Sequence, residues 1–302
     1  MKKLLLTYIL TIGICAAAGI STGIILKKTI GPIDEMYPPG FDPSEFSPDT
    51  EAIMKKYDAL SDKSINGARN FTDAEIVNVA QEKFKACENC YYFSRGDANT
   101  IVTQSIRGSF CKNGEEYYEE QMSYSSMVAL AKRSYQHADG TIAVHDGTPS
   151  NAEVASYPAS PSQTYDKASY KDYLGKTLDE VFIYVVSDKT VLDSTRTTKG
   201  DDVVLKMNLN PNLSTFFYKK QMLNLSGLSN LPPFTEVKLT YTISASDLTL
   251  KHVSVDETFT ATKEGIPVPA KTQNIIELYY HANEFYKIPS PNEQFDYSIK
   301  EA

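Results

Sequence analysis

The stretch 239–262, LTYTISASDLTLKHVSVDETFTAT, decides the fold class of this chain. Its first half alternates apolar and polar residues, which is the pattern of a β-strand with one buried face. A turn at Ser246–Asp247 leads into a second alternating strand. In that strand the apolar residues change from even positions, such as Leu250, to odd positions, such as Val253. The change near Lys251–His252 predicts a β-bulge, which bends a strand and curves its sheet.

Alternation of period two also runs through residues 90–144 and through a last segment, 274–283. The pair Asn113–Gly114 has the chemistry of a tight hairpin turn. Alternating strands joined by short turns are typical of an antiparallel meander. We therefore expect neighbouring strands of the chain to pair with one another.

Other segments show helical features. Thr72–Glu75 matches a capping box, and apolar residues follow it at helical spacing. Ser47–Pro48 is expected to begin an earlier helix, and Asn210–Pro211 a later one that reaches about Leu223. Segment 177–186 is compatible with either a helix or a buried strand. Helices between meanders predict an α+β fold: a curved antiparallel sheet, or half-barrel, with helices packed on its concave face.

The first 28 residues predict a membrane anchor. Residues 4–26 carry no charge, and about 20 apolar residues are enough for a helix to span a bilayer. We interpret 1–28 as a signal anchor, a single transmembrane helix that leaves the bulk of the chain extracytoplasmic at the cell membrane. Two alternatives stay open: a signal peptide cleaved near Ala16–Ala18, or a lipoprotein modified at Cys15.

The remainder divides into a stalk and a domain. Residues 29–49 are rich in proline and carboxylates, which predicts a stiff, extended stalk. Residues 50–302 are expected to form one extracytoplasmic α+β domain. Within it, 147–173 is rich in Tyr, Ser and Pro and is expected to be a long loop or a link between two halves. Its tyrosines are a candidate contact surface for a partner: Tyr157, Tyr165, Tyr170 and Tyr173.

The net charge of the chain is −8 and its pI is about 5.2. Binding to a nucleic acid backbone needs clustered Lys and Arg, so we expect no nucleic acid partner. A pair of glutamates at 115–116 and another at 119–120 are expected on a solvated strand face.

Three cysteines lie within the predicted domain. Cys87 and Cys90 form a C-x-x-C, but they follow a predicted helix, whereas a redox pair precedes one. Zinc needs about four ligands, and only Cys111 and scattered histidines are at hand; we expect neither a metal nor a cofactor. In an oxidising compartment Cys111 is expected to pair with Cys87 or Cys90; without oxidation machinery all three are expected to stay free.

Catalytic motifs lack their required context. A G-x-S-x-G at 19–23 lies inside the predicted membrane span, where no strand-to-helix elbow can form. An S-x-x-K at 109–112 has neither of the triplets that accompany it in penicillin-recognising enzymes. We assign no catalytic residue and expect that the protein is not an enzyme.

The order of elements resembles the periplasmic lipoprotein-carrier superfamily, the LolA and LppX-like half-barrels. The similar segments are QSIRGSF with YYEEQMSY, then DGTIAVHDG, and the late hairpin 237–262. The chain departs from that pattern in lacking a good lipobox and in carrying the proline-rich stalk. The resemblance implies a sheet whose hollow side takes a lipid tail.

An inward-facing apolar stripe is the candidate wall of that hollow, although plain core packing is the favoured explanation of it: Val102, Ile106, Phe110, Tyr118, Met122, Tyr241 and Ile243. We therefore expect a membrane-anchored protein that binds a lipid or other apolar ligand as a carrier or sensor. The alternative is a surface module without a small-molecule ligand. It would contact a protein partner of the cell envelope or the cell wall through the tyrosines of 147–173.

Overall fold

The computed structural model describes residues 41–126, 128–226, 228, 230–263, 265–280, 288–291 and 293. Within these residues no helix is both long enough and apolar enough to cross a membrane. The predicted anchor 1–28 and the first part of the predicted stalk, 29–40, lie outside the described residues.

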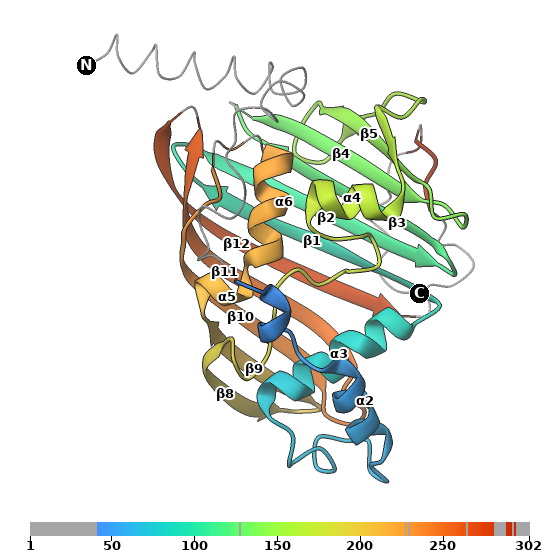
Figure 1. Ribbon diagram of the computed structural model, residues 1–302, viewed down its shortest axis with the longest axis vertical. Helices are drawn as coiled ribbons and strands as arrows, with labels where there is room; N and C mark the ends of the chain where they lie inside the picture. The colour runs from blue at the N-terminus through green and yellow to red at the C-terminus, as the bar shows by residue number, and fades with distance from the viewer. Residues whose placement is uncertain are drawn as a thin grey trace.

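The domain is dominated by one open sheet of twelve strands, and its described strand pairs are antiparallel (Figure 1). The first meander contains β1 (Asn89–Asn99), β2 (Thr103–Asn113), β3 (Glu116–Tyr124), β4 (Ala129–Gln136), β5 (Ile142–Pro149), β6 (Ala155–Ser156) and β7 (Gln163–Tyr165). The second contains β8 (Val191–Lys199), β9 (Asp202–Leu209), β10 (Phe234–Ser244), β11 (Leu250–Lys263) and β12 (Ile266–Tyr280). Pairing of β1 with β12 joins the two meanders into one sheet.

The helices lie over one face of the sheet, here called the helix-bearing face (Figure 1). They are η2 (Pro43–Phe46), α2 (Thr50–Asp58), α3 (Asp73–Ala86), α4 (Lys167–Leu174), α5 (Pro211–Ser214) and α6 (Phe216–Ser226). The class is thus α+β, with β-structure in the majority.

The predicted capping box is confirmed at the start of α3. Thr72 Oγ1 accepts from Glu75 N at 3.1 Å, and Glu75 Oε2 accepts from Thr72 N at 2.9 Å. The start predicted for α2 was two residues early, because Asp49, rather than Ser47, accepts the hydrogen bond of Ala52 N. The later helix is interrupted at Thr215, which ends α5 before α6 begins.

The predicted bulge is confirmed in β11. Thr242 of β10 pairs with His252, whereas the next residue, Ile243, pairs with Leu250, so Lys251 is the extra residue. The insertion keeps Leu250 and Val253 on the same face although their parity differs, and both side chains are buried in the core.

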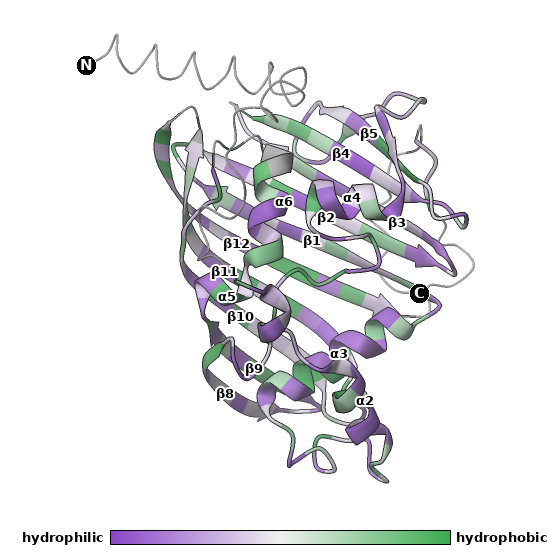
Figure 2. Cartoon of the chain, viewed as in Figure 1, coloured by the Kyte–Doolittle hydropathy of each residue, from purple (hydrophilic) through white to green (hydrophobic). Residues whose placement is uncertain are grey.

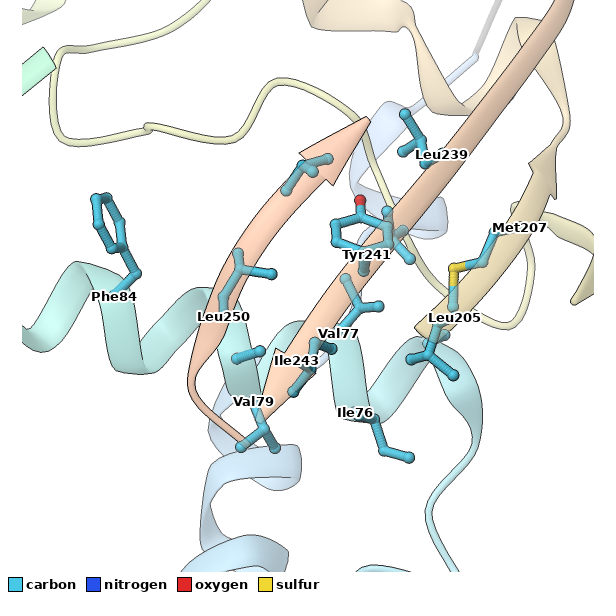
Figure 3. Packing of buried hydrophobic residues seen from close by; sticks show 14 of the residues in the cluster. Ile76, Val77, Val79, Phe84, Leu205, Met207, Leu239, Tyr241, Ile243 and Leu250 are labelled. Carbon is cyan, nitrogen blue, oxygen red and sulfur yellow. The ribbon is translucent and has the colours of Figure 1, made fainter. Parts of the chain in front are cut away.

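The main core lies between α3 and the second meander (Figure 3). Helical spacing turns Ile76, Val77 and Val79 of α3 inward, where they meet Leu205 of β9 and Tyr241 of β10. Figure 2 shows hydrophobic and hydrophilic bands alternating along the strands, as a sheet with differently solvated faces requires. Each fully buried side chain of this size contributes about 1.5–3 kcal/mol.

The region predicted as a loose insertion is ordered: 147–173 contains the end of β5, the strands β6 and β7, and most of α4. The last part of the predicted stalk also belongs to the domain. The ring of Phe41 packs 5.5 Å from the ring of Phe216, and Ser187 Oγ donates to Phe46 O at 2.6 Å. Segment 177–186 is neither helix nor strand.

Candidate functional site

A cavity of about 230 Å³ opens on the helix-bearing face, between the end of α3, strands β1–β3 and residues 179–181. Five of the lining side chains are aromatic, aliphatic or thiol groups: Phe84, Cys90, Phe110, Tyr117 and Val181. The charged side chains of Lys85, Lys112 and Asp179 complete the lining.

Phe110 is the centre of the aromatic wall. It projects from β2, where its neighbour on β1, Tyr92, stacks on it with ring centroids 5.3 Å apart. The rings of Phe84 and Tyr117 lie 6.3 and 6.2 Å away from that of Phe110. Phe84 reaches this position because α3 buries the face that carries Ile76 and Ala80. Aromatic packing of this kind makes the wall rigid.

Lys112 and Asp179 have hydrogen-bonding groups that a ligand in the cavity could use. Lys112 Nζ donates to the Lys85 carbonyl oxygen at 2.7 Å, and an ammonium group has two further N–H bonds. Asp179 Oδ1 is buried and has no hydrogen-bond partner among the described residues. Burial raises the pKa of Asp179, but a hydrogen bond from Thr177 and the charge of Lys167 outweigh it and lower the pKa. The cavity therefore offers a cationic donor and an ionised acceptor.

The predicted disulfide is absent, because Cys87, Cys90 and Cys111 are free thiols. Cys90 lines the cavity on the helix-bearing face. Cys111 pairs with Tyr91 across β1 and β2, and its side chain belongs to the cluster on the opposite face. Burial raises the pKa of the Cys90 thiol to about 12, so it stays protonated at neutral pH.

The seven predicted cavity residues do not form one stripe, which corrects that prediction. The turn after β2 pairs Asn113 with Glu116, so even positions of β2 share a face with odd positions of β3. Ile106 and Phe110 consequently point to the helix-bearing face, and Tyr118 and Met122 to the opposite face.

The other three predicted residues also lie away from the cavity. Val102 lies in the β1–β2 connection, and Tyr241 and Ile243 are packed in the core beneath α3. Of the seven, Phe110 alone lines the described cavity.

The four predicted contact tyrosines likewise do not form one exposed surface. Tyr170 lies on the buried side of α4 and its hydroxyl donates to Ser134 Oγ at 3.0 Å. Tyr165 and Tyr173 are half-buried, and their rings stack with centroids 5.5 Å apart. Tyr157 lies on the opposite face, where a Cβ at Gly147 would come within 2.3 Å of its ring. Glycine at 147 is therefore what lets Tyr157 pack onto β5.

A buried carboxylate on the helix-bearing face was not predicted from the sequence. Glu257 of β11 accepts from the Tyr184 hydroxyl at 2.8 Å and from the Tyr218 hydroxyl at 3.0 Å. Burial raises the pKa of Glu257 to about 7, against the lowering effect of these two hydrogen bonds. Its signal was in the sequence: a charge stands between Val255 and Phe259, on the face where the neighbouring positions are apolar.

A second missed cluster lies on the opposite face. The side chains of Ser109, Glu120, Arg133 and His145 form one row across β2–β5, and all are buried. Arg133 Nε lies 3.3 Å from Glu120 Oε1, and its guanidinium carbon lies 4.0 Å from the centre of the Tyr157 ring.

The glutamates at 115–116 and 119–120 were all predicted to be solvated, and this prediction is wrong for Glu119 and Glu120. Glu120 pairs with Arg133, and Glu119 pairs with Lys176 at 2.9 Å on the helix-bearing face. Glu115 and Glu116 are exposed, as expected, because they lie at the hairpin turn.

Within the described part of the chain, no group of three or more His, Cys, Asp or Glu side chains is placed to hold a metal ion.

No protein-family model and no curated protein matches the chain. Among solved structures, it is similar to Rv2717c from M. tuberculosis, at 11% identity over 68% of this chain and 97% of that one, with a TM-score of 0.21. Two inactive variants of CurK dehydratase match at 10% identity and a TM-score of 0.12, over 70% of this chain and 85% and 84% of theirs. Likenesses at this level assign neither a family nor a function.

Proposed function

We propose that the domain binds a small ligand with an apolar body in the cavity between α3 and strands β1–β3. The observation that carries the proposal is the cavity itself, which is lined in similar measure by apolar and polar groups. Ligand sites are typically concave and mostly apolar, with a small number of polar groups that orient the ligand. Carrier or sensor is the role that suits a binding domain for which we assign no catalytic residue.

The cavity volume limits the ligand. Pockets for drug-sized molecules measure about 300–1,000 Å³, whereas an apolar cavity of about 150 Å³ suffices for benzene. The volume of about 230 Å³ therefore suits one aromatic ring or one short acyl chain better than a two-chain lipid. The feature that the domain has in common with the half-barrel carriers is a sheet with helices over one face.

The charges favour an anionic end on the ligand. The Lys112 ammonium has N–H bonds to spare and lies beside Lys85, so a carboxylate at the ligand's end would find a donor there. The Asp179 oxygen can accept from a hydroxyl or N–H group elsewhere on the ligand. A short-chain or aromatic carboxylate has this combination of groups.

The test is titration calorimetry of the purified chain with hexanoate and with phenylacetate. Val181→Phe places a ring inside the cavity and is expected to abolish binding. Val154→Phe, at an exposed position outside the cavity, is the matched control and should bind as the parent does. Absence of binding to the folded parent for both probes would reject the proposal.

Mass spectrometry of organic extracts provides an independent readout. A stoichiometric small carboxylate that is lost in Val181→Phe would support the proposal. A stoichiometric two-chain lipid would instead favour the full lipid-carrier function expected from the sequence.

The predicted anchor adds a location to the proposed function. An uncharged run at residues 4–26 supports a domain held at the extracytoplasmic side of the membrane. Protease treatment of intact spheroplasts should digest the domain and spare a cytoplasmic marker protein. Protection of the domain until the membrane is lysed would reject that location.

A further inference from the structure

Residues 288–291 and 293 of the chain's own segment 288–293 lie on the opposite face of the sheet, where Glu293 N donates to Ser290 O at 2.9 Å and closes a turn. Arg133 donates through Nη1 to the main-chain carbonyl oxygens of Pro291 at 3.3 Å and Glu293 at 2.6 Å. The Arg133 side chain is nine-tenths or more buried on β4, so it is a fixed part of the sheet. Contacts to main-chain carbonyls do not depend on the side chains of the bound segment, so another segment with a similar turn can use them.

An aromatic surface next to Arg133 takes a side chain of the same segment. Ile288 packs against the cluster that Tyr91, Phe93 and Tyr135 form with neighbouring residues. Tyr91 stacks on Tyr279 with ring centroids 4.7 Å apart, which widens this surface onto β12. Segment 288–293 thus makes an apolar anchor contact through Ile288 and main-chain contacts through its turn.

The segment leaves the polar capacity of this surface unfilled. Arg133 Nη2 is buried and is without a hydrogen-bond acceptor among the described residues. Ser109 Oγ, on β2, is in the same state. A buried polar group without a partner is costly, so an occupant with an additional acceptor would bind this surface better than segment 288–293 does.

We propose that the surface formed by Arg133, Tyr135 and the adjacent tyrosines is a docking site for a peptide that adopts a turn, occupied here by the chain's own segment 288–293. The external partner is a proline-containing peptide with an apolar anchor residue and an acidic side chain that reaches Arg133 Nη2. The guanidinium supplies the charge complementarity, and the peptide competes with the chain's own segment. The site lies on the other face of the sheet from the proposed ligand cavity and does not depend on it.

The experiment uses a fluorescent peptide with the sequence of residues 286–296, YKIPSPNEQFD, and the full chain. Ile288→Asp in the full chain weakens the internal occupant and should tighten peptide binding at least tenfold in fluorescence anisotropy. Arg133→Lys added to Ile288→Asp should remove most of this gain. Unchanged peptide affinity in a folded Ile288→Asp protein would overturn the proposal.

A peptide series tests the acidic side chain. Each peptide carries one Asp at a position corresponding to 288–293, and at least one should bind fivefold more tightly than the parent peptide. The gain should vanish on Arg133→Lys. If no position gains affinity, the requirement for an acidic partner is refuted.

A photo-crosslinking measurement keeps the proposal testable even if Ile288→Asp does not fold. A benzophenone side chain replaces the isoleucine of the peptide, and the unaltered full chain is the target. Crosslinks are expected at Tyr91, Phe93 or Tyr279. Crosslinks confined to other regions would overturn the proposal, as would a dimer that exchanges its own segments and leaves no added peptide bound.

Discussion

The hydroxyl of Tyr184 donates to Glu257 Oε2 at 2.8 Å, so the irregular segment after α4 is attached to a buried carboxylate of strand β11. Tyr218 of α6 donates to the other oxygen of the same carboxylate at 3.0 Å. Glu257 therefore links two covering elements to the sheet, and no ion pair with a cation is found for it in the described part of the chain.

This arrangement predicts a pH-dependent stability. Burial raises the pKa of Glu257 to about 7 in the folded state. Because the folded pKa is above the unfolded one, the stabilisation is fully present below about pH 4.5 and is lost as the pH rises through about 7. The difference of roughly 2.5 pKa units corresponds to about 3 kcal/mol of unfolding free energy.

Glu257→Gln should remove this dependence. Urea unfolding between pH 5 and 8 is expected to show a slope in the parent that is flatter in the variant. Glu153→Gln, at a side chain that is 68% exposed, is the control and should retain the parental slope. Equal slopes in Glu257→Gln and the parent would contradict the assignment.

Phe110→Ala should cost about 3–5 kcal/mol of stability, because a buried aromatic side chain is lost and a void remains. Phe110 is in contact with Tyr92 and packs near Phe84. Ile101→Ala, at an exposed position, is expected to change stability by less than about 0.5 kcal/mol. Denaturant midpoints compare the two; a loss below about 1 kcal/mol for Phe110→Ala would mean that the wall is not rigidly packed.

Breaking the buried ion pair of Arg133 and Glu120 should destabilise the fold much more than breaking an exposed ion pair. Glu120→Gln leaves the Arg133 charge uncompensated and is expected to cost about 3–5 kcal/mol. Glu180→Gln breaks the exposed pair with Lys171 and should cost at most about 1 kcal/mol. Similar losses in thermal unfolding would argue against a desolvated Arg133–Glu120 pair.

The cysteines should differ in reactivity. Cys87 is partly accessible, whereas Cys90 and Cys111 are buried, and burial raises the pKa of each of these two thiols to about 12. Iodoacetamide labelling of the native protein, mapped by mass spectrometry, should modify Cys87 first and the other two only after denaturant is added. If disulfide-linked Cys87–Cys111 or Cys90–Cys111 peptides are recovered, the disulfide predicted from the sequence does form.

Local patterns in the sequence determined several elements. The bulge at Lys251 follows from a change in the parity of apolar residues, and the start of α3 follows from Thr72 and Glu75. Both features depend on residues close in the chain, since a bulge shifts the strand's own alternation and a cap binds its own helix. The antiparallel pairing of consecutive strands is local for the same reason.

The tertiary structure alone decided which face each side chain occupies and what it meets there. A change of one residue in the turn after β2 would reverse the faces of all β3 residues. The observed register places Phe110 and Tyr118 on opposite faces of the sheet. Alternation within each strand does not encode this register. Pairing of β1 with β12 placed residues far apart in the chain side by side, as in Cys90 and Tyr280, which are 190 positions apart. Whether Glu120 and Glu257 are buried depends on the distant segments that cover them. The sequence by itself therefore determined most of the strands, the cap of α3 and the bulge, because these are local, while the cavity, the buried carboxylates and the Arg133 surface arose from long-range packing.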